Sequence, residues 1–140
     1  MSNSITEIMQ QNIYGVTFSG ANICGYHWNT TPELCARWYK IGAFYPLAIN
    51  LNQRDNTPQA PYDFPSDIKD EIQDAMATRY SLLRYMNTNL FQHSLWSDEL
   101  DAGGTFFKPL FFEFPEEEGA YDYMSLNAML GSSIKLSLQS

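Results

Sequence analysis

The residues best suited to chemistry lie between Gly15 and Asn52. A short β-branched and aromatic run, Val16-Thr17-Phe18, leads directly into small residues and then into Cys24 and Tyr26. This pattern predicts a strand whose C-terminal end opens into a loop. In a β/α barrel, the loops at the C-terminal ends of the strands hold the substrate. We therefore expect the function of this chain to reside in the loop 20–29.

The other reactive side chains do not form a recognisable catalytic or metal-binding set. Cys24 and Cys35 permit one intramolecular disulfide, with two reduced core thiols as the alternative, and they lack CxxC spacing. His27 and His93 are far apart and have no metal or triad partners nearby in sequence. The sequence predicts no metal site and no cofactor.

Acidic residues near the end of the chain are poor candidates for catalysis. Glu113 ends a predicted strand, which is a good position for a catalytic carboxylate, but no partner carboxylate is evident. The run 116–118 is typical of a solvated turn. We assign no catalytic residue to either.

Composition limits the class of partner. The chain has 140 residues, of which 44% are hydrophobic and 15% aromatic, so it is suited to bury a core. Its 16 acidic and 8 basic residues give a formal net charge of −8, which argues against nucleic acid and against an anionic membrane surface. A neutral ligand fits this charge better. No apolar run approaches the ~20 residues needed to span a bilayer, and the polar stretch Met1 to Gln11 does not resemble a signal peptide.

The elements around the loop 20–29 follow from capping and periodicity. Met1 to Gln11 indicates a frayed lead-in or partial helix, and Ile13 to Ser19 a strand. Thr30 or Thr31 is expected to cap a helix that begins at Pro32 and ends at Gly42, with Glu33 at capping-box spacing from Thr30. The polar, proline-rich stretch 43–65 is expected to be a long loop.

The second half of the chain is expected to continue with a helix and a strand. Ser66 is expected to cap a helix that runs towards Leu95, with an apolar stripe of Ile68, Ile72, Met76, Tyr80, Leu83 and Met86. Residues 98–104 indicate a turn, 105–114 an aromatic strand interrupted by Pro109, 116–119 a loop and 134–138 a weak final strand.

This alternation predicts an α/β architecture with parallel strands. The chain is too short for a complete barrel, which needs about 250 residues. We therefore expect the chain to be part of a larger domain. As a separate chain it would have unpaired strand edges and an uncovered aromatic face over 106–114.

Several stretches carry a family resemblance in the same order along the chain. They are 20–26 (GANICGY), 29–38 (NTTPELCARW), 42–46 (GAFYP), 79–85 (RYSLLRY), 103–115 (GGTFFKPLFFEFP) and 129–133 (MLGSS). Together they resemble glycoside hydrolase family 31, the α-glucosidases that include lysosomal, maltase and sucrase types. This resemblance covers nearly the whole chain.

The resemblance implies a fold and an activity for a larger parent. The fold would be a partial (β/α)8 TIM barrel, comprising the seventh and eighth strand region over 1–115, running into the start of a β-sandwich over 116–140. The activity would be retaining hydrolysis of terminal α-linked glucose by two carboxylates. Both carboxylates would lie outside this chain, so the fragment alone would not be catalytic. Its partners would be an α-glucoside or maltooligosaccharide and the remainder of the barrel.

The resemblance also assigns roles to residues of the loop. Asn22 stands where the family usually has a sugar-binding aspartate, although asparagine after a strand is also a common turn residue. Tyr26 and Trp28 would face the sugar, with loop packing as the alternative for Trp28 and for His27. Cys24 and Cys35 match a pair that is disulfide-bonded in secreted members. Asn29-Thr30-Thr31 is a glycosylation sequon that would be used if the parent is extracellular or enters the lysosomal or secretory pathway.

Two further positions depart from the family pattern. Ile49 and Leu51 stand where the family commonly has an arginine and a sugar-binding histidine. Losing such hydrogen-bonding groups typically costs on the order of 3 kcal/mol of transition-state stabilisation. A non-catalytic carbohydrate-binding or assembly protein derived from the family is therefore the alternative function.

Overall fold

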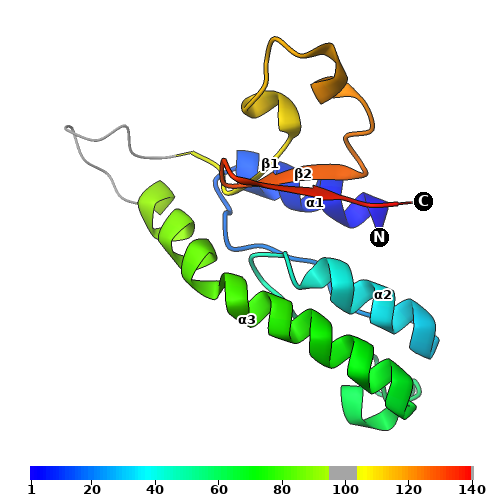
Figure 1. The fold of residues 1–140 in the computed structure, drawn as a ribbon. Helices are drawn as coiled ribbons and strands as arrows, with labels where there is room; N and C mark the ends of the chain where they lie inside the picture. The colour runs from blue at the N-terminus through cyan, green and yellow to red at the C-terminus, as the bar shows by residue number, and fades with distance from the viewer. Residues whose placement is uncertain (95–103, 140) are drawn as a thin grey trace. The chain divides into compact units, whose positions relative to one another are not determined.

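The computed structural model in Figure 1 describes residues 1–94 and 104–139. The chain divides into two compact units, one formed by residues 1–19 and 83–140 and the other by residues 20–82. The first part of the helix α3 (Ser66–Ser94) belongs to the second unit, and its last part belongs to the first. Leu95 and most of the turn predicted at 98–104 lie outside the described residues.

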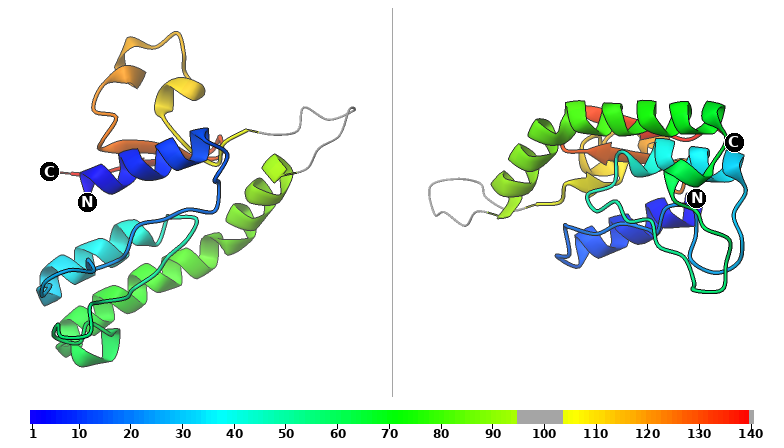
Figure 2. Two further views of the ribbon diagram at one scale, coloured as in Figure 1. Left: turned by 180° about the vertical axis from the view of Figure 1, so that it is seen from behind. Right: turned by 90° about the horizontal axis from the view of Figure 1, so that it is seen from below.

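In the first unit, a helix packs on a small antiparallel sheet. The helix α1 (Ser2–Ile13) contacts the strands β1 (Phe107–Lys108) and β2 (Asn127–Leu130), and β3 (Ile134–Ser137) pairs with β2 to complete the order β1-β2-β3. Figure 2 shows α1 beside this sheet from two further directions. Helical spacing places Ile5, Ile8 and Met9 on one buried face of α1. The N-terminal stretch is therefore a full helix rather than a frayed one.

A buried asparagine joins α1 to the sheet. Asn12 is 1% exposed, and its Oδ1 accepts a hydrogen bond of 3.1 Å from the backbone N–H of Phe107. Its Nδ2 donates to the carbonyl of Ile8 at 3.0 Å and to the hydroxyl of Ser19 at 3.2 Å. The carboxamide thus accepts a hydrogen bond from a buried N–H at the edge of the sheet.

The strand predicted over 13–19 is wrong. Ile13 is the last residue of α1, Gly15 has a φ of 90°, and Val16 and Phe18 are 50% and 60% exposed. No described segment pairs with this stretch, and β-branched residues form a strand only where a neighbouring backbone completes the ladder.

The aromatic strand predicted over 105–114 is much shorter than expected. It ends after Lys108 because Pro109 has no N–H to donate, and a 3-10 turn, η2 (Leu110–Phe112), follows. The strand is antiparallel to β2, so the expected parallel arrangement is also wrong for this sheet. Phe106 and Phe107 are fully buried, whereas Phe112 and Phe114 are about half exposed.

The rest of this unit agrees more closely with the sequence patterns. The final strand is confirmed as β3, and the predicted loop at 116–119 leads into a 3-10 turn, η3 (Glu118–Tyr121). Gly131, with a φ of 57°, turns the chain from β2 to β3. The Tyr85 hydroxyl donates to the carbonyl of Leu130 at 2.7 Å, which ties this hairpin to the last part of α3.

In the second unit, α2 (Pro32–Gly42) packs against the first part of α3 with η1 (Pro61–Asp63) in the connecting loop. Thr31 is the N-cap, and its hydroxyl accepts a hydrogen bond of 3.2 Å from the N–H of Leu34. The capping-box spacing from Thr30 is therefore not used. The helix ends at Gly42 as predicted, and a Cβ there would lie only 2.6 Å from Cδ1 of Ile23. Close packing, rather than a left-handed turn, requires this glycine.

The stripe predicted for α3 holds only in part. Ser66 is the first helical residue rather than a cap, and Ile68 and Ile72 are buried. Tyr80, by contrast, is 69% exposed and Leu83 is 39% exposed. The predicted pattern followed hydrophobicity alone, and it missed that a long polar side chain, Arg79, occupies the inner face.

Arg79 binds the backbone that follows α2. Its guanidinium donates to the carbonyls of Ala43, Tyr45 and Pro46 at 3.0, 2.6 and 3.0 Å, with a longer contact of 3.4 Å to Gly42. Burial lowers the pKa of Arg79 from its ordinary value. The carbonyls at a helix C-terminus have no intrahelical partners, so a fixed multidentate cation is well suited to satisfy them.

Candidate functional site

The loop 20–29 runs parallel to the segment that follows Pro46. The N–H of Ile23 donates to the carbonyl of Ile49 at 2.7 Å, and Asn22 and Ile49 form an isolated parallel bridge. A Cβ at Gly20 would lie 1.8 Å from the carbonyl oxygen of Leu47, so only glycine allows the two backbones to approach so closely. Among the described residues, this bridge is the parallel backbone pairing that the structure contains, in contrast to the parallel strands expected of the architecture.

The side chain of Asn22 adds two hydrogen bonds between the loop 20–29 and the segment that follows Pro46. Its Oδ1 accepts from the N–H of Leu51 at 3.0 Å, and its Nδ2 donates to the carbonyl of Leu51 at 2.6 Å. A carboxamide carries one acceptor and one donor side by side, as a peptide group does. Asn22 therefore contacts the protein backbone on both sides of one residue.

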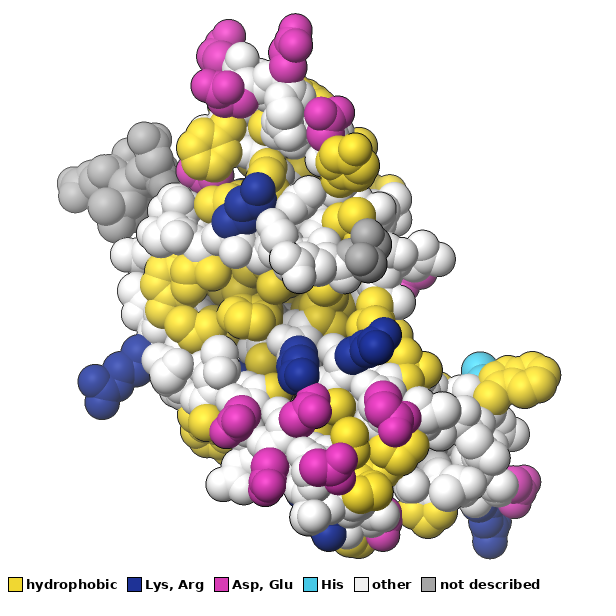
Figure 3. Space-filling view, turned by 45° about the vertical axis from the view of Figure 1, so that its right-hand side comes forward, with side chains coloured by type: hydrophobic (Ala, Val, Ile, Leu, Met, Phe, Trp, Pro, Cys, Tyr) yellow, Lys and Arg dark blue, Asp and Glu magenta, His cyan; other side chains and the backbone are white. Residues whose placement is uncertain are grey.

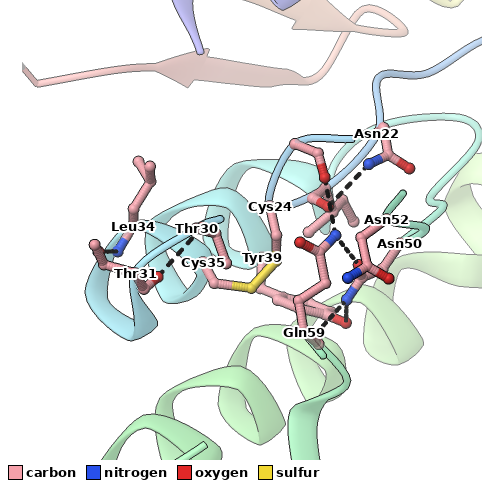
Figure 4. The surroundings of a disulfide bond; sticks show 12 residues. Asn22, Cys24, Thr30, Thr31, Leu34, Cys35, Tyr39, Asn50, Asn52 and Gln59 are labelled. Carbon is pink, nitrogen blue, oxygen red and sulfur yellow. Dashed lines mark hydrogen bonds between the residues drawn. A yellow bond between two sulfur atoms is a disulfide. The ribbon is translucent and has the colours of Figure 1, made fainter. Parts of the chain in front are cut away.

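A disulfide ties the same loop to α2, as Figure 4 shows. Cys24 and Cys35 are bonded, with their Cα atoms 4.4 Å apart, which confirms the predicted pair and excludes two reduced thiols. Cys24 has a φ of 71°, and both residues belong to the buried core of this unit. Closing a loop of this length typically contributes roughly 3 kcal/mol by restricting the unfolded chain.

A buried glutamine, which the sequence patterns did not reveal, links the two loops. Gln59 is 4% exposed, and its Nε2 donates to the carbonyl of Gly25 at 2.9 Å, to Oδ1 of Asn50 at 2.7 Å and to the carbonyl of Leu51 at 3.3 Å. Asn50 in turn donates to the Tyr39 hydroxyl at 2.9 Å. Burial raises the pKa of Tyr39, against a smaller lowering by this hydrogen bond. Only the position of Gln59 in the proline-rich loop could have drawn attention to it.

The aromatic side chains of the loop lie at the surface. Tyr26 is 47% exposed and Trp28 is 84% exposed. Their backbone carbonyls accept hydrogen bonds from Nδ2 of Asn56 at 3.2 and 2.9 Å, which fixes the loop while leaving the rings exposed. His27 contacts the ring of Tyr26 edge-on and lies 3.3 Å from Oε1 of Gln53 through its Nδ1. Exposed rings on a fixed backbone are suited to stacking on a flat ligand.

The side chains at positions 49 and 51 present apolar surface. Ile49 and Leu51 are 38% and 60% exposed. Because side chains alternate along an extended segment, these two lie on one side, while Asn50 between them points towards Tyr39. Neither apolar side chain can donate a hydrogen bond to a sugar hydroxyl.

The sequon is part of the folded structure. Oδ1 of Asn29 accepts from the N–H of Thr57 at 2.8 Å, and Thr31 is the N-cap of α2. The Asn29 side chain lies at the surface. Glycosylation of Asn29 remains a prediction.

Where the structure describes them, the charged side chains form no second candidate site. Glu113 forms an ion pair with Lys108, which accounts for its position after β1. Acidic side chains are spread over the face shown in Figure 3, consistent with the net charge of −8. Over residues 1–94 and 104–139, no three histidine, cysteine, aspartate or glutamate side chains gather as metal ligands would. None of the helices in these ranges combines the length and hydrophobicity that crossing a membrane requires.

Relatives of known activity match the chain closely in sequence. Lysosomal acid alpha-glucosidase of Tetrahymena pyriformis is 42% identical over 116 residues, which are 81% of this chain and 12% of that protein. Alpha-glucosidase of Mucor javanicus is 40% identical over 140 residues, which are 98% of this chain and 15% of that protein. The chain thus spans less than a sixth of either relative.

Solved structures and a family model agree with these relatives. A family 31 alpha-glucosidase from Bacteroides thetaiotaomicron superposes with a TM-score of 0.86 at 25% identity, covering 99% of this chain and 23% of that one. The alpha subunit of glucosidase II superposes with a TM-score of 0.81 at 31% identity, covering 93% and 13%. The model of the Glycosyl hydrolases family 31 TIM-barrel domain matches residues 1–89. Since that match covers more than half of the 140 residues, the chain belongs to glycoside hydrolase family 31, and residues 1–89 match its barrel domain.

Proposed function

We propose that this chain forms part of the sugar-binding wall of an α-glucosidase-like protein. The intact parent would hydrolyse terminal α-linked glucose, using two carboxylates that lie outside this chain. Its ligand would be an α-glucoside or a maltooligosaccharide, with Tyr26 and Trp28 contacting the sugar rings and Asn22 beside them. The observation that carries the proposal is the fixed loop 20–29, which presents exposed aromatic rings from a chain of this family.

The proposal extends to the surroundings of the wall. Residues 1–115 would belong to the seventh and eighth strand region of the barrel, and residues 116–140 to the start of a following β-sandwich. The remainder of the barrel would be the chief partner. The parent would be extracellular or reside in the lysosomal or secretory pathway, in keeping with the disulfide and with the lysosomal relatives.

Substitution of the exposed rings in the full-length protein tests this function. We expect Trp28→Ala and Tyr26→Ala to weaken maltose binding or raise KM by about tenfold, because each removes a stacking surface. Tyr62→Ala is the matched control, since Tyr62 is an aromatic residue of the same unit and is 76% exposed. Equal effects of all three substitutions, or none from the first two, would contradict the proposal.

A non-catalytic carbohydrate-binding or assembly protein is the alternative, and the exposed Ile49 and Leu51 favour it. The intact mass of the native protein and its turnover of maltose separate the two functions. A large protein that hydrolyses maltose supports the enzyme. Saturable binding of maltose without hydrolysis supports the alternative. Sustained turnover by the purified 140-residue chain would contradict the assignment of the carboxylates to the rest of the parent.

A further inference from the structure

Leu51 is the point at which the two loops of the site are joined. Its N–H donates to Oδ1 of Asn22 at 3.0 Å, and its carbonyl accepts from Nδ2 of Asn22 at 2.6 Å. The same carbonyl accepts a second hydrogen bond, of 3.3 Å, from Nε2 of Gln59. Two carboxamides, Asn22 from the loop 20–29 and Gln59 from the stretch 43–65, therefore both contact Leu51.

The chemistry of these contacts requires an amide at position 22. An aspartate there could accept from the N–H of Leu51 but would have no proton for its carbonyl. A carboxylate oxygen would then face the carbonyl oxygen across a gap that is now 2.6 Å, and the two would repel. Alanine would leave both peptide groups of Leu51 to water. The negative charge that the family usually carries at this position is incompatible with this geometry.

The same argument applies to Gln59. Its Nε2 faces three oxygens, namely the carbonyls of Gly25 and Leu51 and Oδ1 of Asn50. Gln59 is 4% exposed, so replacing its amide by a carboxylate would remove these hydrogen bonds from a part-buried network that links both loops. Through Gly25, this side chain also holds the residue that precedes Tyr26.

We propose that Asn22 and Gln59 are positioning residues that lock the two loops together through Leu51. They fix the direction in which Ile49 and Leu51 point, and the place of Tyr26 relative to them. Asn22 thereby acts on a ligand through Leu51, its carboxamide being engaged with the backbone. This inference rests on the proposed function for its ligand, but the lock itself is a property of the loops.

Hydrogen exchange of the Leu51 amide in the full-length protein tests the lock without any ligand. We expect Asn22→Ala to speed exchange in peptides covering 49–53 by about tenfold, because it removes the acceptor of the Leu51 N–H. The isosteric Asn22→Asp should have a similar effect, because its carboxylate repels the Leu51 carbonyl and separates the two groups. Gln59→Glu should do the same. Asn52→Ala is the matched control, because Nδ2 of Asn52 donates only to the carbonyl of Thr57, at 2.8 Å, and leaves Leu51 untouched.

Maltose binding by the same variants tests the consequence of the lock for the ligand. We expect Asn22→Asp and Gln59→Glu to weaken maltose binding by about tenfold, with Asn52→Ala unchanged, because the lock orients the wall. Unchanged exchange at Leu51 in both isosteric variants would overturn the lock. Faster exchange with unchanged maltose affinity would overturn the positioning role. If the unaltered protein binds no maltose, the proposed function fails, while the exchange data still decide the lock.

Discussion

A substitution of Arg79 tests how the backbone next to the candidate site is stabilised. Its guanidinium makes three hydrogen bonds of 3.0 Å or less to the carbonyls of Ala43, Tyr45 and Pro46. These residues connect α2 to the segment that pairs with the loop 20–29. Replacing Arg79 by methionine keeps much of the side-chain volume and removes every donor. The carbonyls then depend on water at a half-buried position.

The expected loss can be estimated from these contacts. A hydrogen bond from a charged group contributes about 1.5–3 kcal/mol, and water can replace part of that at a half-buried site. We expect Arg79→Met to lower the free energy of opening of residues 42–47 by about 3 kcal/mol. Arg79→Lys should lose about half as much, since one ammonium cannot reach carbonyls spread over four residues.

The assay is native-state hydrogen exchange of peptides covering 42–47, because it reports the local opening of this segment. Arg37→Met is the control. Arg37 is exposed on α2, and the described part of the chain shows no hydrogen bond or ion pair for it. Exchange that is unchanged in Arg79→Met, or equally faster in the control, would refute this account of Arg79.

Substitutions at three further positions, Gly20, Thr31 and His93, give additional tests. Gly20→Ala should disrupt the pairing of the two loops by about 3 kcal/mol, since its Cβ would lie 1.8 Å from the carbonyl oxygen of Leu47; normal exchange at the Ile23 amide would contradict this. Thr31→Ala should cost α2 about 1 kcal/mol through loss of the N-cap, and Thr31→Ser should retain it, as measured by exchange in the first turn. Burial and Lys108 lower the pKa of His93, so the unfolded chain binds more protons just below pH 6.5. Stability should therefore fall as pH drops through this range, and His93→Gln should flatten the dependence of the melting temperature on pH.

Local capping and spacing predicted α2 correctly. Proline at the first position, a threonine before it and a glycine at the end define α2 through contacts within a few residues. The pairing of Cys24 with Cys35 came from resemblance to the family, and the structure confirms it. The family was recognisable because its motifs occur in the same order in this chain, although the chain spans only a small part of its relatives' length.

The strand predictions failed because a strand forms only where a neighbouring backbone completes its hydrogen bonds. The run 13–19 has suitable residues but finds no neighbouring backbone among the described segments, and Pro109 cuts the aromatic strand to two residues. Hydrophobic periodicity likewise placed Tyr80 on the inner face of α3, where Arg79 lies instead. Hydrophobic periodicity identifies the side chains that favour burial. It does not identify the polar side chain that will hydrogen-bond to the backbone carbonyls after a helix.

By itself, the sequence determined the family, the disulfide and the loop that carries the candidate site. Those features depend on residue identity and on contacts close along the chain. Only the tertiary structure decided that Asn22 contacts the backbone of Leu51 and that Gln59 joins both loops. Hydrogen bonds between carboxamides and peptide groups depend on where distant backbones meet, and any backbone offers the same N–H and carbonyl groups. No residue type at position 51 could have marked it as the partner.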